Sequence, residues 1–458
     1  MAMTSVNNST PVQARGSSAP ASYGPALAVL TTLFFIWGSL TSLNDVLIPF
    51  AQHVFQLNLA QSFLIQTAFF LAYFIISLPA AKIIDWVGYK RAIIVGLSTM
   101  VAACLLVYPA AKIPSFPFFL TALMVLAAGI TVLQVAANPY VAVLGRPETA
   151  SSRLNLTQAF NSLGTAVFPW VGARLILGET ASAAAQSASQ DAVVKLYVYF
   201  FAILLVLLAI LFAVFRLPKM EAAEHHIGQK IDDSIWKHPN LVYGAIGIFV
   251  YVGAEVAIGS SIANYLALPN IGHFASDIAD PAQRYHSALA VAARYISLYW
   301  LGAMVGRFIG SAVLQKLKTS LVLAFCSIMA TLLVIVSVAG SGAIAMWSIL
   351  AVGLFNSIMF PSIFTSGIAE LGQLTGDGSG LLNMAIVGGA VIPWIVGKVG
   401  DVINHRFYPA MTQGETSWGQ GIHYALIIAA ICYLYILFYA VSGSKPNSER
   451  YSHTGARG

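Results

Sequence analysis

One carboxylate draws attention because it lies inside an apolar segment. Asp45 follows Thr41 by one helical turn and Asn44 adjoins it, so a helix would bring three oxygen-bearing side chains close together. A charged residue at the centre of a membrane helix costs about 2.5 to 3.5 kcal/mol, so it needs a functional or structural reason. Asp45 could carry a proton, hold sodium together with Thr41 and Asn44, accept a hydrogen bond from a sugar hydroxyl, or pair with another helix.

Two more charged residues fall inside apolar segments in the second half of the chain. Glu255 lies one turn after Tyr251, and Arg294 lies in the apolar segment that follows. An ion pair between Glu255 and Arg294 would lower the cost of placing both in lipid. The alternative is a direct role, with Glu255 as a second coupling residue beside Asp45 or with either residue in contact with a substrate.

Amide side chains at helical spacing form the second kind of candidate. Gln134 and Asn138 are four residues apart and Gln158 and Asn161 are three apart, so each pair shares a helix face. Amides both donate and accept, which suits sugar hydroxyls, although they also hold membrane helices together. Pro139 frees a backbone carbonyl one turn earlier. The candidate substrate-binding residues are Trp37, Asn44, Gln134, Asn138, Gln158, Asn161, Asn356 and Asn383.

The elements that position these residues must be membrane helices. Hydrophobic residues make up 58% of the chain, charged residues 9%, and the mean hydropathy is +0.78. A soluble domain carries about 25% charged residues. Because lipid cannot satisfy open backbone groups, apolar segments of about 20 residues must be helical. The sequence therefore predicts an all-α integral membrane protein with twelve spans, near residues 26–50, 60–82, 91–111, 116–144, 151–177, 193–216, 240–268, 286–314, 319–341, 343–372, 377–404 and 419–442.

A repeated phrase divides the chain into two related halves. Gly164-Thr-Ala-Val-Phe-Pro169-Trp reappears 224 residues later as Gly388-Gly-Ala-Val-Ile-Pro393-Trp. Such duplication is typical of membrane transporters and predicts two pseudo-symmetric six-helix bundles. The expected divisions are a disordered cytoplasmic tail at 1–25, bundles at 26–216 and 240–442, a cytoplasmic linker at 217–239 and a second cytoplasmic tail at 443–458.

The two copies differ in chemistry. Counting from the aligned glycines, Gln158 and Asn161 correspond to the apolar residues Leu382 and Ala385. The sugar and ion chemistry is therefore expected in the first bundle, with the second bundle mainly closing over it.

The positive charges predict the orientation. Most of the 23 Lys and Arg residues fall on the side where the N-terminus would lie, so the positive-inside rule places both termini in the cytoplasm of a multi-pass bacterial inner-membrane protein. The net charge of +6 then reflects orientation, and nucleic acid is not expected as a partner. A monomer in the lipid bilayer is expected, with no cofactor other than a coupling ion.

Five segments contain the candidate residues or lie near them. They are Asn44-Asp-Val-Leu-Ile-Pro49, Gln134-Val-Ala-Ala-Asn138-Pro139-Tyr, Arg153-Leu-Asn-Leu-Thr-Gln158-Ala-Phe-Asn161, Tyr251-Val-Gly-Ala-Glu255 and Pro361-Ser-Ile-Phe-Thr-Ser-Gly. These segments resemble the fucose permease and glucose/galactose transporter branch of the major facilitator superfamily.

The resemblance implies proton-linked transport through Asp45, with Asn44, Gln158 and Asn161 on cavity positions. Gln134 departs from the fucose permease pattern, which has a second carboxylate there, and this puts a relay between two acids in doubt. Gln134 and Glu255 are instead similar to the glucose/galactose members.

The expected function is proton- or sodium-coupled uptake of a neutral hexose, such as glucose, galactose or mannose, by alternating access. The alternatives are an uncoupled sugar uniporter, a fucose or N-acetylglucosamine symporter and, more distantly, a membrane sugar sensor or scaffold. An enzyme is not expected, since no metal-ligand spacing or nucleophile–base grouping stands out.

Overall fold

The computed structural model describes residues 23–55, 64–113, 115–176, 191, 193–218, 233–274, 276–278, 280–408, 420–446 and 448. Most of the two expected terminal tails and most of the expected linker lie outside these residues. The backbone of Asn44 and Asp45 belongs to a helix, but their side chains are not among those described. Every regular element in the described ranges is helical.

The first half contributes five long helical elements. They are α1 (Gly24–Phe55), α3 (Leu64–Lys112), α4 (Phe116–Val143), α5 (Ala150–Ile176), and α7 (Ile203–Val214), which continues the π-helix η2 (Lys195–Ala202).

Helix α3 is too long to be one span. Its 49 residues would extend about 74 Å at a rise of about 1.5 Å per residue, more than twice the thickness of the hydrocarbon core. It bends back at Gly88, where φ is 77°, a backbone conformation that glycine adopts without steric cost. The two arms correspond to the spans predicted near 60–82 and 91–111.

The second half is more interrupted, and several of its spans are built from consecutive short helices. Its elements are η3 (Ile235–Lys237), α8 (Pro239–Leu266), α9 (Pro281–Ala292), η4 (Ala293–Tyr295), α10 (Ile296–Val313), α11 (Thr319–Ala339), α12 (Gly342–Asn356), α13 (Met359–Gly367), η5 (Gly372–Leu374), α14 (Thr375–Met384), η6 (Ala385–Val387), α15 (Gly388–Phe407), α16 (Gly421–Ala425), α17 (Ile427–Phe438) and η8 (Tyr439–Gly443).

The predicted set of membrane helices is confirmed. In the described residues, ten stretches are long and apolar enough to cross a membrane, and one of them, Leu64–Ala110, contains both arms of α3. Helix α5, with 27 residues, is not among the ten because serines, threonines and amides interrupt its apolar sequence. Counting both arms of α3, and adding α5, gives the twelve spans.

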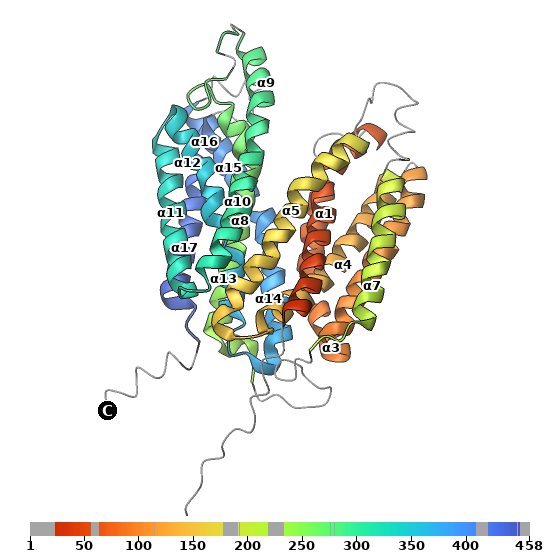
Figure 1. Cartoon of the computed structure of the whole chain (residues 1–458). Helices are drawn as coiled ribbons and strands as arrows, with labels where there is room; N and C mark the ends of the chain where they lie inside the picture. The colour runs from red at the N-terminus through yellow and green to blue at the C-terminus, as the bar shows by residue number, and fades with distance from the viewer. Residues whose placement is uncertain are drawn as a thin grey trace, which may run out of the picture.

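The helices form two groups, α1 to α7 and α8 to α17, which lie side by side in Figure 1. The groups approach each other at the end where α7 finishes and α8 begins, which we call the linker end, and they diverge toward the end that carries α9. Cross-group contacts at the linker end include the Lys82 Nζ–Asp377 Oδ1 ion pair at 2.8 Å and the Ser151 and Thr365 hydroxyls, 2.6 Å apart. This end is therefore closed in the structure.

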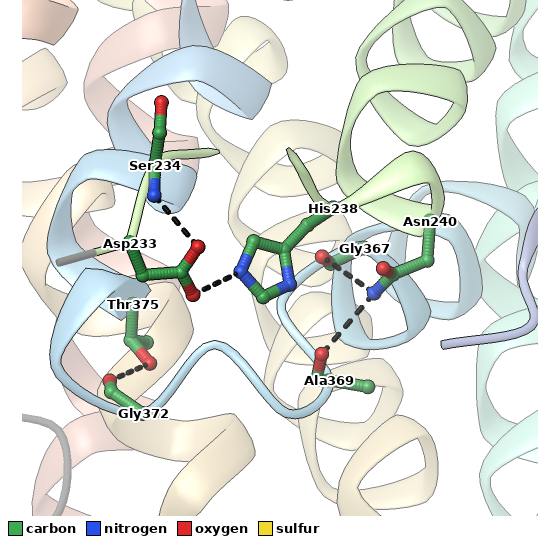
Figure 2. Close-up of polar contacts among 8 residues, drawn as sticks. All are labelled: Asp233, Ser234, His238, Asn240, Gly367, Ala369, Gly372 and Thr375. Atoms are coloured by element: carbon green, nitrogen blue, oxygen red, sulfur yellow. Dashed lines mark hydrogen bonds and ion pairs between the residues drawn. The ribbon is translucent and has the colours of Figure 1, made fainter. Parts of the chain in front are cut away.

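The start of α8 is anchored to the end of α13 (Figure 2). Asn240 Nδ2 donates to the carbonyls of Ser366, Gly367 and Ala369 at 3.0, 3.2 and 3.1 Å, which satisfies carbonyls that a helix end leaves without intrahelical donors. This anchoring explains why a polar residue opens the apolar helix α8.

An acidic residue lies just before this helix. His238 Nε2 lies 2.7 Å from Asp233 Oδ2, and the Ser234 amide donates to Asp233 Oδ1 at 2.7 Å, as Figure 2 shows. The His238 ring and the Ser234 amide hold the pKa of the Asp233 carboxyl below its usual value. The stabilisation that this contact gives to the ionised carboxylate is therefore present near neutral pH and is lost as the pH falls through that lowered pKa.

The repeated phrase has the same packing role in both halves. A Cβ at Gly164, in α5, would overlap the backbone oxygen of Phe35 in α1, and a Cβ at Gly388, in α15, would overlap the backbone oxygen of Phe249 in α8. Each glycine thus lets the repeated helix contact the first helix of its own half backbone to backbone. The symmetry in sequence is a symmetry of helix packing.

We expect Gly164→Ala to lower the stability of the protein by about 1 to 3 kcal/mol, because the added methyl forces α1 and α5 apart. Gly397→Ala is the matched control, since nothing lies within 4 Å of a Cβ at Gly397 in α15. There alanine should be neutral or slightly stabilising. Thermal unfolding of the purified protein in detergent measures both, and equal unfolding temperatures for the two variants would contradict the close α1–α5 contact.

Candidate functional site

A cavity of about 210 Å³ lies between the two groups of helices. Elements of both groups supply its walls, as expected for a carrier that binds its substrate between two halves. The lining residues are Trp37, Gly38, Thr41, Tyr73, Gln134, Gln158, Asn161, Thr165, Tyr251, Val252, Glu255, Arg307, Phe360 and Ile386.

The first half presents neutral amide and hydroxyl groups to the cavity. Gln134 Nε2 donates to the Tyr73 hydroxyl at 2.5 Å, which joins α4 to α3. Asn161 Nδ2 donates to the Phe34 carbonyl at 2.9 Å, which joins α5 to α1. Gln158 lines the cavity one turn from Asn161. Gln134 and Asn161 are held in place by neighbouring helices, so a ligand would meet a largely preformed polar wall.

An aromatic ring borders the same wall. Trp37 is 4% exposed, and its ring centroid lies 4.1 Å from that of Phe34. Thr41, one turn further along α1, also lines the cavity, and its hydroxyl donates to the Trp37 carbonyl at 2.8 Å. Asp45 follows after one more turn of this helix, although its side chain lies outside the described part of the structure.

The second half supplies the charged groups that line the cavity in the described part of the chain. They are Glu255 on α8 and Arg307 on α10. The Tyr251 hydroxyl donates to Glu255 Oε1 at 2.8 Å and also contacts the Asn356 carbonyl at 3.1 Å. The second bundle therefore does more than close over the site, in contrast to the expectation from the aligned repeat. That alignment compared α5 with α14 and η6, whereas the charges lie on α8 and α10.

Arg307 connects the two halves at the edge of the cavity. Its Nη1 donates to the Gln158 carbonyl at 3.4 Å and to the Ser162 hydroxyl, both on α5. Its Nε donates to the Ser357 carbonyl at 3.3 Å. In a regular helix the N–H of residue 361 would donate to the Ser357 carbonyl. Pro361 has no N–H, so the Ser357 carbonyl is open to a donor from elsewhere. Arg307 supplies that donor.

Arg307 is not among the candidate residues that the sequence marked for the site. The available signal was its position well inside the span predicted at 286–314. The expected Glu255–Arg294 ion pair does not form between these two described residues, because Arg294 is exposed in η4. Arg307, about three and a half helical turns further along, lies at the cavity that Glu255 lines.

The structure brings four of the eight candidate substrate-binding residues to the cavity. These are Trp37, Gln134, Gln158 and Asn161. Asn138, Asn356 and Asn383 are fully buried and do not line it. Asn356 Nδ2 donates to the Tyr299 hydroxyl at 2.7 Å, and Asn383 Nδ2 donates to the Ser379 carbonyl at 2.9 Å, so both bind neighbouring protein groups.

Asn138 is the unusual member of this group. Neither its amide nitrogen nor its oxygen has a hydrogen-bond partner in the described part of the chain. The side chain of Asn44 lies outside the described residues.

In the described part of the chain, two groups of membrane helices enclose a polar cavity between them, which is the arrangement of a multi-pass membrane transporter. Residues 27–393 match the Major Facilitator Superfamily, and the chain belongs to this family.

Similar proteins share nearly the full length of the chain. The glucose/galactose transporter of Brucella abortus biovar 1 (strain 9-941) is 47% identical over 96% of this chain and 99% of its own length. The L-fucose-proton symporter of Escherichia coli (strain K12) is 30% identical over 92% and 93%. The transporter FucP, solved in the outward conformation, superposes with a TM-score of 0.78 at 29% identity, covering 93% of this chain and 100% of that one.

We expect Arg307→Gln to destabilise the protein, because the Gln158 and Ser357 carbonyls lose a charged donor. Such hydrogen bonds contribute about 1.5 to 3 kcal/mol. Arg294→Gln, which changes an exposed arginine, should have little effect. Thermal unfolding in detergent compares the two, and an equal loss in both variants would refute the assignment of Arg307 to the contact between the halves.

Proposed function

We propose that this protein takes up a neutral hexose, with glucose and galactose as the first candidates, together with a proton by alternating access. The observation that carries the proposal is the cavity wall of Gln134, Gln158 and Asn161, whose amide groups both donate and accept hydrogen bonds as sugar hydroxyls require. The aromatic face of Trp37 borders the same cavity and suits the apolar face of a sugar ring. Full-length similarity to a protein named as a glucose/galactose transporter supports the hexose.

Proton coupling is supported by the relative named as an L-fucose-proton symporter. In the proposed mechanism Asp45 carries the proton, because it lies one helical turn beyond the cavity residue Thr41. Glu255 is the second candidate, although its contact with Tyr251 and the nearby Arg307 also suit a structural carboxylate. Gln134 cannot titrate, so a relay through that position is not part of the mechanism.

The proposed setting is the inner membrane of a bacterium, with both termini in the cytoplasm and the protein acting as a monomer. The linker end is then the cytoplasmic end, and its closure corresponds to an outward-facing state. The likeness to FucP in the outward conformation supports this reading. Sugar would enter from the side on which the helices diverge and leave after the linker end opens.

Purified protein in liposomes provides the test. We expect uptake of glucose or galactose against a concentration gradient under an inward proton gradient, and none under a sodium gradient alone. Asp45→Asn should abolish this accumulation but retain exchange of labelled for unlabelled sugar. Accumulation by Asp45→Asn equal to that of the parent protein would remove Asp45 from coupling, and the absence of hexose uptake or exchange under any gradient would overturn the function.

We expect Gln158→Ala and Asn161→Ala each to weaken sugar affinity about tenfold, since a hydrogen bond to a sugar hydroxyl contributes about 1 kcal/mol or more. Asn138→Ala is the matched control, because Asn138 is an amide buried outside the cavity lining. Equilibrium binding of labelled sugar measures the three affinities. Unchanged affinity in both helix α5 variants would exclude that helix from the sugar site.

A further inference from the structure

The linker end contains a cross-half hydrogen bond that depends on a proline. Pro139 lies inside α4 and has no backbone N–H, so it cannot bond the carbonyl of Val135 one turn earlier. Ser379, on α14 of the other half, donates its hydroxyl to that carbonyl at a distance of 2.8 Å. The Val135 carbonyl in the first half thus receives its hydrogen bond from Ser379 in the second half.

The hydroxyl of Ser379 is held in the orientation that this bond needs. Asn383 Nδ2 lies 3.3 Å from Ser379 Oγ and donates to it, while also donating to the Ser379 carbonyl at 2.9 Å. With Asn383 as its donor, the hydroxyl hydrogen is left for Val135. Ser379 and Asn383 are both 0% exposed, so water does not compete for the bond in this conformation.

The two halves are in close contact around this bond. A Cβ at Gly380, the residue after Ser379, would lie 2.9 Å from the Ala81 side chain and 3.0 Å from the Ser77 carbonyl on α3. The Ser379–Val135 bond therefore belongs to a close contact between helices of the two halves. The bond also lies next to the proposed sugar site, because Val135 directly follows Gln134, which lines the cavity.

We propose that Pro139 and Ser379 form a latch that holds the linker end closed, and that this latch must break before a sugar can leave on that side. In a regular helix the residue 139 amide would bond Val135 in both the closed and the open state, so the cross-half bond would add little preference for closure. Pro139 has no amide hydrogen for that bond. The Val135 carbonyl therefore depends on Ser379 when the linker end is closed and on water when the linker end is open. Ser379 and Pro139 are thus positioning residues for transport.

The proposal rests on alternating access, but on neither the identity of the sugar nor that of the coupling ion. Its test can therefore measure opening of the linker end without any transport. Ser151 supplies the reporter position, because its hydroxyl lies 2.6 Å from that of Thr365 across the closed contact and Ser151 is 4% exposed. In a Ser151→Cys background, a hydrophilic maleimide labels this position when the linker end opens. The native residues Cys104, Cys326 and Cys432 are all buried, and labelling of the protein without Ser151→Cys is subtracted.

We expect Ser379→Ala to raise the labelling rate about two- to tenfold, the factor that corresponds to the net contribution of one hydrogen bond. The matched control is Ser327→Ala, which removes a buried hydroxyl that donates to the carbonyl of Leu323 within its own helix, and which should leave the rate unchanged.

The decisive comparison uses a second background. In Pro139→Ala, the new amide can bond Val135 within α4, so adding Ser379→Ala should change the labelling rate less than it does in the parent. Labelling is measured on protein that remains monodisperse and helical. An unchanged rate in Ser379→Ala would overturn the proposal, as would an increase of the same size in the Pro139→Ala background. Failure of sugar uptake with the expected labelling pattern would instead overturn the proposed function alone.

Discussion

A polar group that enters the membrane region of this protein is costly unless the protein or water supplies a partner, because lipid tails offer none. This requirement explains contacts that would otherwise look unrelated. The Tyr251 hydroxyl bonds Glu255, Arg307 bonds carbonyls on both halves, and Ser379 bonds a carbonyl that Pro139 cannot. Pro139 and Pro361 matter here because each removes one backbone donor, and a side chain from a different helix supplies the hydrogen bond instead.

The same requirement separates the symmetric part of the molecule from the asymmetric part. Gly164 and Gly388 permit equivalent backbone contacts in the two halves, so the duplicated sequence preserved helix packing. The cavity is not duplicated in this sense. Amides on α4 and α5 face a carboxylate and a guanidinium on α8 and α10, so each half brings a different chemistry to one shared space. A ligand in that space touches both halves, so its affinity depends on the relative position of the two halves.

The contacts at the linker end illustrate how such a carrier can be stable and still move. They are small polar contacts between serine, threonine, asparagine and lysine side chains and their partners, as in Ser151–Thr365 and Lys82–Asp377. Each is individually worth little, since exchanging a hydrogen bond between protein groups for one to water changes the free energy by only about 0.5 to 1.5 kcal/mol. The conformations with the linker end closed and open can then differ by a small free energy, which a bound ligand is able to reverse.

The sequence by itself determined the membrane class, the twelve spans, the duplication and the polar face of α5, because hydrophobic length and helical periodicity are local properties that lipid enforces segment by segment. It also marked Gln134, Gln158 and Trp37 as candidates through their residue types. It could not decide which polar residues share a cavity, because that depends on the rotation and tilt of helices distant in sequence. Only the tertiary structure showed that Arg307, and not Arg294, lies at the cavity that Glu255 lines. It also showed that three candidate amides are buried away from the cavity wall, namely Asn138, Asn356 and Asn383. Finally, it showed that Ser379 bonds the carbonyl that Pro139 leaves without a donor.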